Sequence, residues 1–145
     1  YKIIGTYRAV EPVGGKRAGL EILSDFSKKG SVDVVFTVND GGGLSVVQEL
    51  VKAKRSEILV ASVDGAPESV DNVKNSRNTV IVSAQFCSEI GKKSIQTAYE
   101  FLQGKAIPKK VLVPTFPVTK ETISVYPGWQ GDIPSSFKKS KVIKG

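Results

Sequence analysis

Hydrophobic and polar residues alternate along the chain in blocks that have the lengths of strands and helices. Apolar runs of strand length occupy residues 33–38 (DVVFTV), 57–63 (EILVASV) and 79–84 (TVIVSA), and a shorter run, KIIGT, precedes them at 2–6. Each run is followed by apolar residues at the spacing of one helical face. The pattern therefore predicts a succession of strand–helix units.

The helices are predicted from their inward faces and their end residues. The third opens at Pro67 and runs from about 67 to 75, and the fourth spans about 87–103 and closes at Gly104. The apolar positions expected to face the core are Leu20, Leu23 and Phe26 on the first helix, Leu44, Val47, Leu50 and Val51 on the second, and Ile90, Ala98, Phe101 and Leu102 on the fourth.

Strands that are apolar throughout are typical of sheets covered by helices on both sides. The predicted fold class is therefore α/β, a doubly wound and mostly parallel sheet in a three-layer α/β/α arrangement. After Gly104, five prolines within 107–136 suit edge strands better than another strand–helix unit. Short edge strands are predicted at Val111–Val113 and Thr122–Val125, followed by a basic tail, SFKKSKVIKG.

Length and composition indicate one globular domain, since 145 residues with 40% hydrophobic content can bury a core. The longest apolar stretch falls short of the roughly 20 residues of a membrane span. The chain begins with Tyr1 and contains no methionine. We therefore expect a processed or trimmed chain from which a signal peptide has been removed.

Charge and cysteine usage exclude several classes of function. The 21 lysines and arginines exceed the 14 acidic residues, yet they are spread along the chain without aromatic stacking positions, so no nucleic-acid partner is expected. With Cys87 as the single cysteine and no histidine, we expect no disulfide within the chain, no metal site and no cofactor.

Polar side chains follow each predicted strand. These are Thr6, Tyr7 and Arg8, then Asn39 and Asp40, then Asp64, then Gln85. Ligands of open parallel sheets bind at the carboxyl ends of the strands. A mixture of donors and acceptors beside an aromatic ring suits a polyhydroxylated neutral ligand, because every hydroxyl both donates and accepts.

The stretch NDGGGLSVVQEL at 39–50 has competing interpretations. It lacks the spacing of a nucleotide-binding P-loop and of a dinucleotide fingerprint. Asn39, Asp40 and Asp64 are also common turn formers and helix N-caps, so each has a purely structural alternative. The glycines at 41–43 are expected to leave room for a ligand or a facing domain.

Three segments together resemble the second lobe of periplasmic sugar-binding proteins of the ribose-binding type: DVVFTVNDGGGLSVVQEL, EILVASVDGAPESVDNV and VIVSAQFCSEIGKKSIQTAYEFLQGK. The resemblance covers residues 33–105. It implies that Asn39, Asp64 and Gln85 hydrogen-bond a sugar or related polyol. Because the loop at 6–20 differs from the family's, Tyr7 or Arg8 is expected to complete the pocket.

The resemblance also implies how the protein is organised. Residues 1–107 correspond to the core of the second lobe, with the helix at 87–103 belonging to the first lobe in the intact protein. Residues 108–126 correspond to a hinge crossing and edge strands, and 127–145 to a C-terminal tail. The expected partners are the missing first lobe or a complementary chain, and the permease of an ABC importer, outside the cytoplasm in the periplasm or the extracellular space.

Two other functions share this fold. One is the effector-binding domain of a regulator similar to the lactose repressor, which would carry a helix-turn-helix upstream. The other is a flavodoxin-like enzyme domain, in which Asp40, Asp64 or Cys87 would be the nucleophile. The absence of histidine removes the usual base for a cysteine nucleophile, so the sequence favours binding over catalysis.

Overall fold

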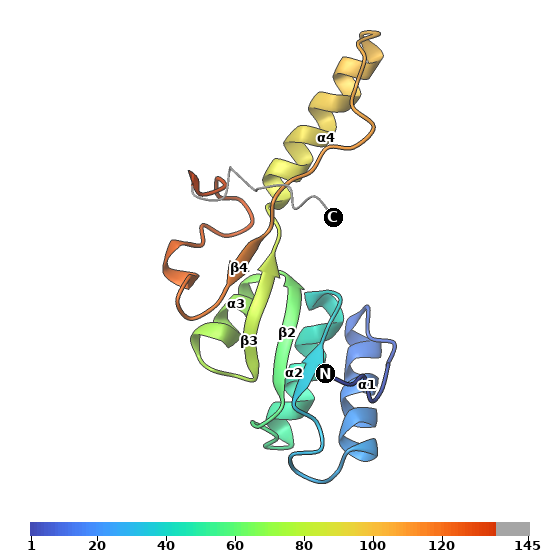
Figure 1. Ribbon diagram of the computed structural model, residues 1–145, viewed down its shortest axis with the longest axis vertical. Coiled ribbons are helices and arrows are strands. Elements are labelled where there is room, and N and C mark those ends of the chain that lie inside the picture. The colour runs from blue at the N-terminus through green and yellow to red at the C-terminus, as the bar shows by residue number, and fades with distance from the viewer. Residues whose placement is uncertain (136–145) are drawn as a thin grey trace.

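Strands and helices alternate along the computed structural model, which describes residues 1–135 (Figure 1). The elements in chain order are α1 (Pro12–Asp25), β1 (Val34–Phe36), α2 (Asp40–Lys52), β2 (Leu59–Asp64), α3 (Pro67–Lys74), β3 (Thr79–Ala84), α4 (Cys87–Leu102), β4 (Phe116–Val118) and a 3-10 turn, η1 (Ile123–Val125). The strand–helix units predicted at 33–51, 57–75 and 79–103 are confirmed. The predicted basic tail at 136–145 lies outside the described residues.

The four strands form one sheet in the order β1-β2-β3-β4. β1, β2 and β3 run parallel, and β4 pairs antiparallel with β3. β2 thus lies between β1 and β3, with Phe36 beside Ala61 and Asp64 beside Ala84. This mostly parallel sheet confirms the predicted α/β class.

The strand predicted at residues 2–6 does not form, and this prediction is wrong. Ile3 and Ile4 are exposed, whereas the residues that follow turn toward the helices, where Tyr7 and Ala9 pack against the apolar cluster of α1, α2 and β2. Contact with the helices replaces strand pairing. The outer edge of β1 consequently has no partner strand among residues 1–135.

Helix α1 packs on α2 mainly through small residues; the predicted Leu23 and Phe26 pack partly buried against the same apolar cluster, whereas the prediction for Leu20 is wrong. The buried residues of α1 include Gly15, Ala18, Gly19 and Ile22, which follow the helical period, whereas Leu20 is 49% exposed. A side chain at Gly15 would overlap the backbone of Gly42. The close approach of the two helices therefore selects the glycine face, and this leaves the larger Leu20 outside.

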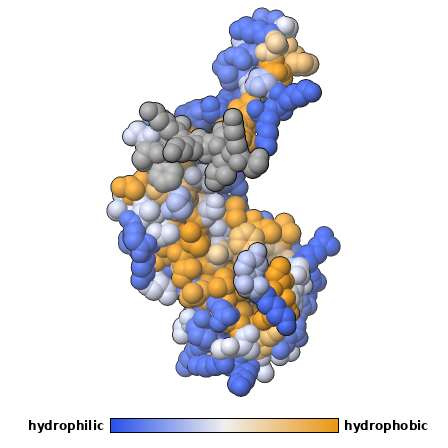
Figure 2. Space-filling view, viewed as in Figure 1, coloured by the Kyte–Doolittle hydropathy of each residue, from blue (hydrophilic) through white to orange (hydrophobic). Residues whose placement is uncertain are grey.

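The sheet is covered by helices on one face only within the described residues. Val60 and Val82 are fully buried beneath the helices, but exposed apolar side chains on the sheet include Val34, Phe36, Leu59 and Ile81. Figure 2 shows hydrophobic surface over the sheet on the side that faces the viewer. The second helical layer predicted from the apolar strands is not found in residues 1–135.

The edge strand after α4 lies between the two predicted ones. Residues 111–113 are irregular and 123–125 form the turn η1, while Phe116–Val118 pairs with β3. Phe116 and Val118 are buried and Pro117 between them is exposed. Proline cannot donate to a neighbouring strand, so it is tolerated in the edge strand.

Helix α4 extends away from the sheet (Figure 1). None of its 16 residues is buried against the rest of the described chain, so the prediction that Ile90, Ala98, Phe101 and Leu102 face inward is wrong. Its apolar side chains Ile95, Phe101 and Leu102 are instead exposed.

Candidate functional site

Three predicted ligand-binding residues meet at the carboxyl end of the sheet. Asn39 precedes the first residue of α2, Asp64 ends β2, and Gln85 follows β3 directly. Because the three strands are parallel neighbours, their carboxyl ends lie at the same edge. This convergence agrees with the position expected of a ligand site in an open parallel sheet.

Asp64 lies at the centre of this group. Its Oδ1 accepts a 2.7 Å hydrogen bond from the Gln85 amide, and its Oδ2 accepts one of 3.2 Å from the backbone N–H of Asp40. An ionised carboxylate offers about four acceptor positions, so acceptor capacity remains for hydroxyl donors. The side chain of Asp64 is therefore both oriented and able to bind.

Asn39 caps helix α2. Its Oδ1 accepts from the N–H of Gly42 at 3.1 Å and its Nδ2 donates to the carbonyl of Val10 at 2.9 Å. The structural alternative for this residue is therefore real. The side-chain amide of Asn39 carries a second N–H, and the residue is partly exposed. Capping therefore leaves a donor available to a ligand.

Asp40 holds the turn that follows Asp64. It is 2% exposed, and its carboxylate accepts hydrogen bonds from the N–H groups of Gly65 (2.9 Å) and Ala66 (2.7 Å). The Ser62 hydroxyl donates to the other oxygen. These contacts give Asp40 a positioning role rather than the role of a nucleophile.

Sequence reasoning missed this role because it depends on a turn 24 or more residues away. The available signal was an aspartate in the first helical turn, where a carboxylate is favoured by the helix dipole. That signal does not reveal which distant N–H groups the carboxylate accepts from.

The glycines of the 39–50 stretch serve packing within the chain. A side chain at Gly42 would overlap the carbonyl of Ala9, and one at Gly43 would come within 2.6 Å of the Thr37 hydroxyl. The space that they leave is thus filled by the chain itself. At Gly42 and Gly43, the expectation that this space admits a ligand or a facing domain is wrong.

The Tyr7 hydroxyl is directed at α1 rather than at Asn39, Asp64 or Gln85. The Tyr7 hydroxyl donates a 2.8 Å hydrogen bond to Asp25, the last residue of α1. This hydrogen bond is the main cause, and slight burial a smaller one, of a raised pKa of Tyr7. Arg8 is exposed. Since the strand at 2–6 is absent, nothing in the sheet directs these two residues toward Asp64.

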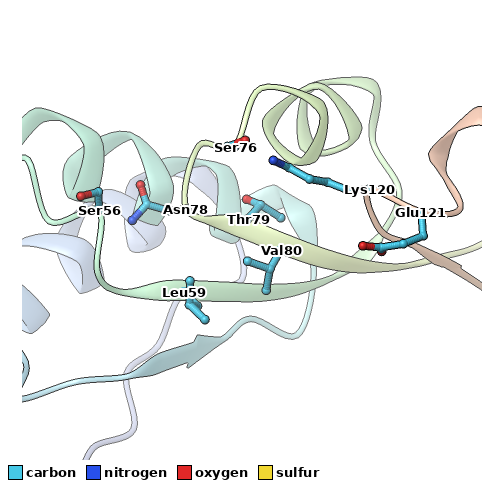
Figure 3. Close-up of a pocket in the computed structure, with 8 residues that line it drawn as sticks. All are labelled: Ser56, Leu59, Ser76, Asn78, Thr79, Val80, Lys120 and Glu121. Carbon is cyan, nitrogen blue, oxygen red and sulfur yellow. The ribbon is translucent and has the colours of Figure 1, made fainter.

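A separate pocket of about 340 Å³ lies at the opposite, amino end of the strands, where Leu59 begins β2 and Thr79 begins β3 (Figure 3). Its Asn78 amide is already used, because it donates to the carbonyls of Arg55 and Ile58 at 2.8 Å. None of the predicted ligand-binding residues lines this pocket, whose other polar lining residues are Ser56, Ser76, Thr79, Lys120 and Glu121.

The described residues contain no cluster of three metal-ligating His, Cys, Asp or Glu side chains. Cys87 is exposed at the start of α4. Along residues 1–135, no helix has both the length and the apolar content required to cross a membrane.

Comparison with known proteins relates the chain to sugar receptors, although no family model matches it. It is 28% identical over 104 residues to the ribose import binding protein RbsB of Escherichia coli, a match that covers 71% of this chain and 35% of that protein. An ABC transporter solute-binding protein from Agrobacterium vitis, solved with bound allitol, superposes with a TM-score of 0.78 at 28% identity, over 84% of this chain and 43% of that one.

A sugar transporter subunit from Rhodobacter sphaeroides gives a TM-score of 0.74 at 28% identity, over 82% of this chain and 44% of that one. The chain thus spans about a third of the length of the curated relatives that it matches. In sequence and in fold, the chain is similar to ribose-type sugar-binding proteins of ABC transporters and matches part of their length.

Proposed function

We propose that the chain supplies one lobe of a receptor that binds a sugar or polyol between two lobes by hinge closure. The observation that carries this proposal is the Asp64 carboxylate, held by Gln85 and by the N–H of Asp40 at the carboxyl end of the sheet. A carboxylate beside amide groups suits hydroxyls that donate and accept. The receptor binds its ligand without breaking a bond in it.

The proposed ligand contacts are Asn39, Asp64 and Gln85. The participation of Tyr7 and Arg8 stays a prediction, since the structure leaves the Tyr7 hydroxyl on Asp25. The relatives set the ligand class: one is named for ribose import and another was solved with allitol. Both ligands are small polyhydroxylated molecules, as the polar groups of this edge require.

The proposed partners follow from the transporter relatives. The second lobe is the part of the receptor that the chain does not span, and the loaded receptor delivers its ligand to the permease of an ABC importer. The proposed location is the periplasm or the extracellular space, after removal of a signal peptide and with a lipid anchor in a Gram-positive host. Similarity to transporter components favours this function over a repressor effector domain or an enzyme.

Calorimetric titration of the full-length protein with ribose, allitol and other pentoses, hexoses and polyols tests the proposal. We expect one ligand to bind tightly and Asp64→Asn to weaken it about 30-fold, because a charged hydrogen bond contributes about 2 kcal/mol. Asparagine tolerates the positive φ of this position. The exposed Asp33, which precedes β1 at the amino end of the sheet, provides the matched control, Asp33→Asn, which should bind normally.

Two results would count against the proposal. Silence of the whole ligand panel would remove the receptor function itself. Unchanged affinity in a folded Asp64→Asn variant would remove only Asp64 from the site.

A further inference from the structure

A segment near the C-terminal end of the described chain, Tyr126–Trp129, lies against the Asp64 turn. The indole Nε1 of Trp129 donates a 2.7 Å hydrogen bond to the backbone carbonyl of Asp64. The carbonyl of Trp129 accepts a 3.2 Å hydrogen bond from the N–H of Ser88, in the first turn of α4. Trp129 therefore joins the end of β2 to the beginning of α4.

Tyr126 anchors this segment on the core. Its ring stacks on Phe116 at a centroid distance of 5.5 Å and contacts Phe86 at 6.4 Å. Its hydroxyl lies 3.4 Å from the Gly65 carbonyl, where it donates a weak hydrogen bond. The segment thus contacts both residues of the Asp64–Gly65 turn, and Tyr126 holds it against the core.

The backbone of Asp64 needs such support. Its φ is 108°, a conformation that side-chain-bearing residues avoid and that persists only where the surroundings hold it. The Asp64 carbonyl accepts the Trp129 indole N–H and also the N–H of Gln85 at 2.8 Å. Trp129 and Gln85 thus hold the backbone from which the Asp64 carboxylate projects, and the Gln85 amide also holds the carboxylate itself.

We propose that Trp129 is a positioning residue of the ligand site: its indole N–H holds Asp64 in the conformation that presents the carboxylate beside Gln85. This inference rests on the proposed function, because it assigns Trp129 to the site that Asp64 forms. It places a determinant of binding in residues 127–135, which the sequence assigned to a tail.

The 145-residue chain contains one tryptophan, and its indole N–H is identified as the NMR signal that disappears in Trp129→Phe. Trp129→Phe keeps an aromatic ring and removes the donor. In the full-length protein, we expect this variant to weaken binding of ribose or allitol about three- to tenfold, as loss of one hydrogen bond predicts. We also expect the amide signals of Gly65 and Ser88 to shift.

The matched control is Tyr99→Phe on α4, where the ring is 59% exposed and the affinity should not change. A purely structural role would lower the unfolding temperature of Trp129→Phe but leave the affinity of the folded variant intact. That result would overturn the inference.

Two further outcomes separate the inference from the proposed function. If Trp129→Phe does not fold, hydrogen exchange of the indole N–H in the unmodified protein decides: slow exchange and a shift on sugar addition support the inference, and fast exchange overturns it. If the unmodified protein binds no sugar, the proposed function fails. In that case the amide NMR signals of Gly65 and Ser88 still test the positioning role, which is overturned if they do not change in Trp129→Phe.

Discussion

Two regions of the molecule differ in how far their side chains are buried and hydrogen-bonded within the chain. One is the sheet body, which consists of the sheet and helices α1 to α3, and the other is helix α4. In the sheet body, apolar residues form two buried clusters, and Asp40 and Asp64 are held by hydrogen bonds. On α4, Ile95, Phe101 and Leu102 are more than 60% exposed. A hollow of about 640 Å³ opens between this helix and residues 107–113.

The chain buries the apolar residues of its sheet body by itself, but it does not bury those of α4. The body has a core and an oriented polar edge, whereas α4 has an apolar surface that no other part of residues 1–135 covers. Exposed apolar patches of this kind mark contact surfaces. The uncovered surface of α4 agrees with the finding that the chain matches less than half the length of each of the two solved relatives.

The largest effect should come from a matched pair of leucines. Leu50 is fully buried and Leu102 is 79% exposed. Leu50→Ala should lower the free energy of unfolding by about 3 kcal/mol through lost burial and a cavity, and Leu102→Ala by no more than about 0.5 kcal/mol. Urea denaturation measures both. Equal losses would mean that α4 is packed in solution and would break the comparison.

A pair of acid-to-amide substitutions should give a smaller difference. Asp40→Asn places an N–H₂ group or a weaker acceptor against the N–H groups of Gly65 and Ala66, and should cost about 2 kcal/mol of unfolding free energy. On α4, the exposed Gln96 donates a hydrogen bond to the Glu100 carboxylate, so Glu100→Gln should change the free energy of unfolding by under about 0.5 kcal/mol. An unaffected Asp40→Asn variant would contradict the assigned positioning role.

The smallest effect concerns alkaline pH. Burial, with the charges of Cys87 and Asp40 adding to it, raises the pKa of Tyr126 to about 12. The folded protein therefore keeps this proton more tightly than the unfolded chain does. The resulting contribution of Tyr126 to the free energy of unfolding is present below about pH 10 and is lost as the pH rises toward 12.

Tyr126→Phe should therefore lose less stability than the unmodified protein in urea denaturation across this interval. Tyr99→Phe on α4 serves as the control and should follow the unmodified protein. The same alkaline loss in all three would show that Tyr126 is not buried as the structure describes.

Much of the body was predictable because its signals are local. The boundaries of β3 agree with the apolar run TVIVSA, and Pro67 begins α3 as expected. Residues 2–6 were mispredicted because a short apolar segment is equally able to pair with a strand or pack on helices. Leu20 on α1 was mispredicted as buried because the contact there depends on the close approach of Gly15 to Gly42 rather than on side-chain hydrophobicity.

The sequence by itself determined the α/β class and the succession of strand ends that carries Asn39, Asp64 and Gln85, because periodicity and strand order are local and parallel strands align their carboxyl ends. Only the tertiary structure decided how Asp64 is held. Asp40 is 24 residues before Asp64 and Trp129 is 65 residues after it. Hydrogen bonds across such separations have no local pattern, since they depend on how distant segments pack.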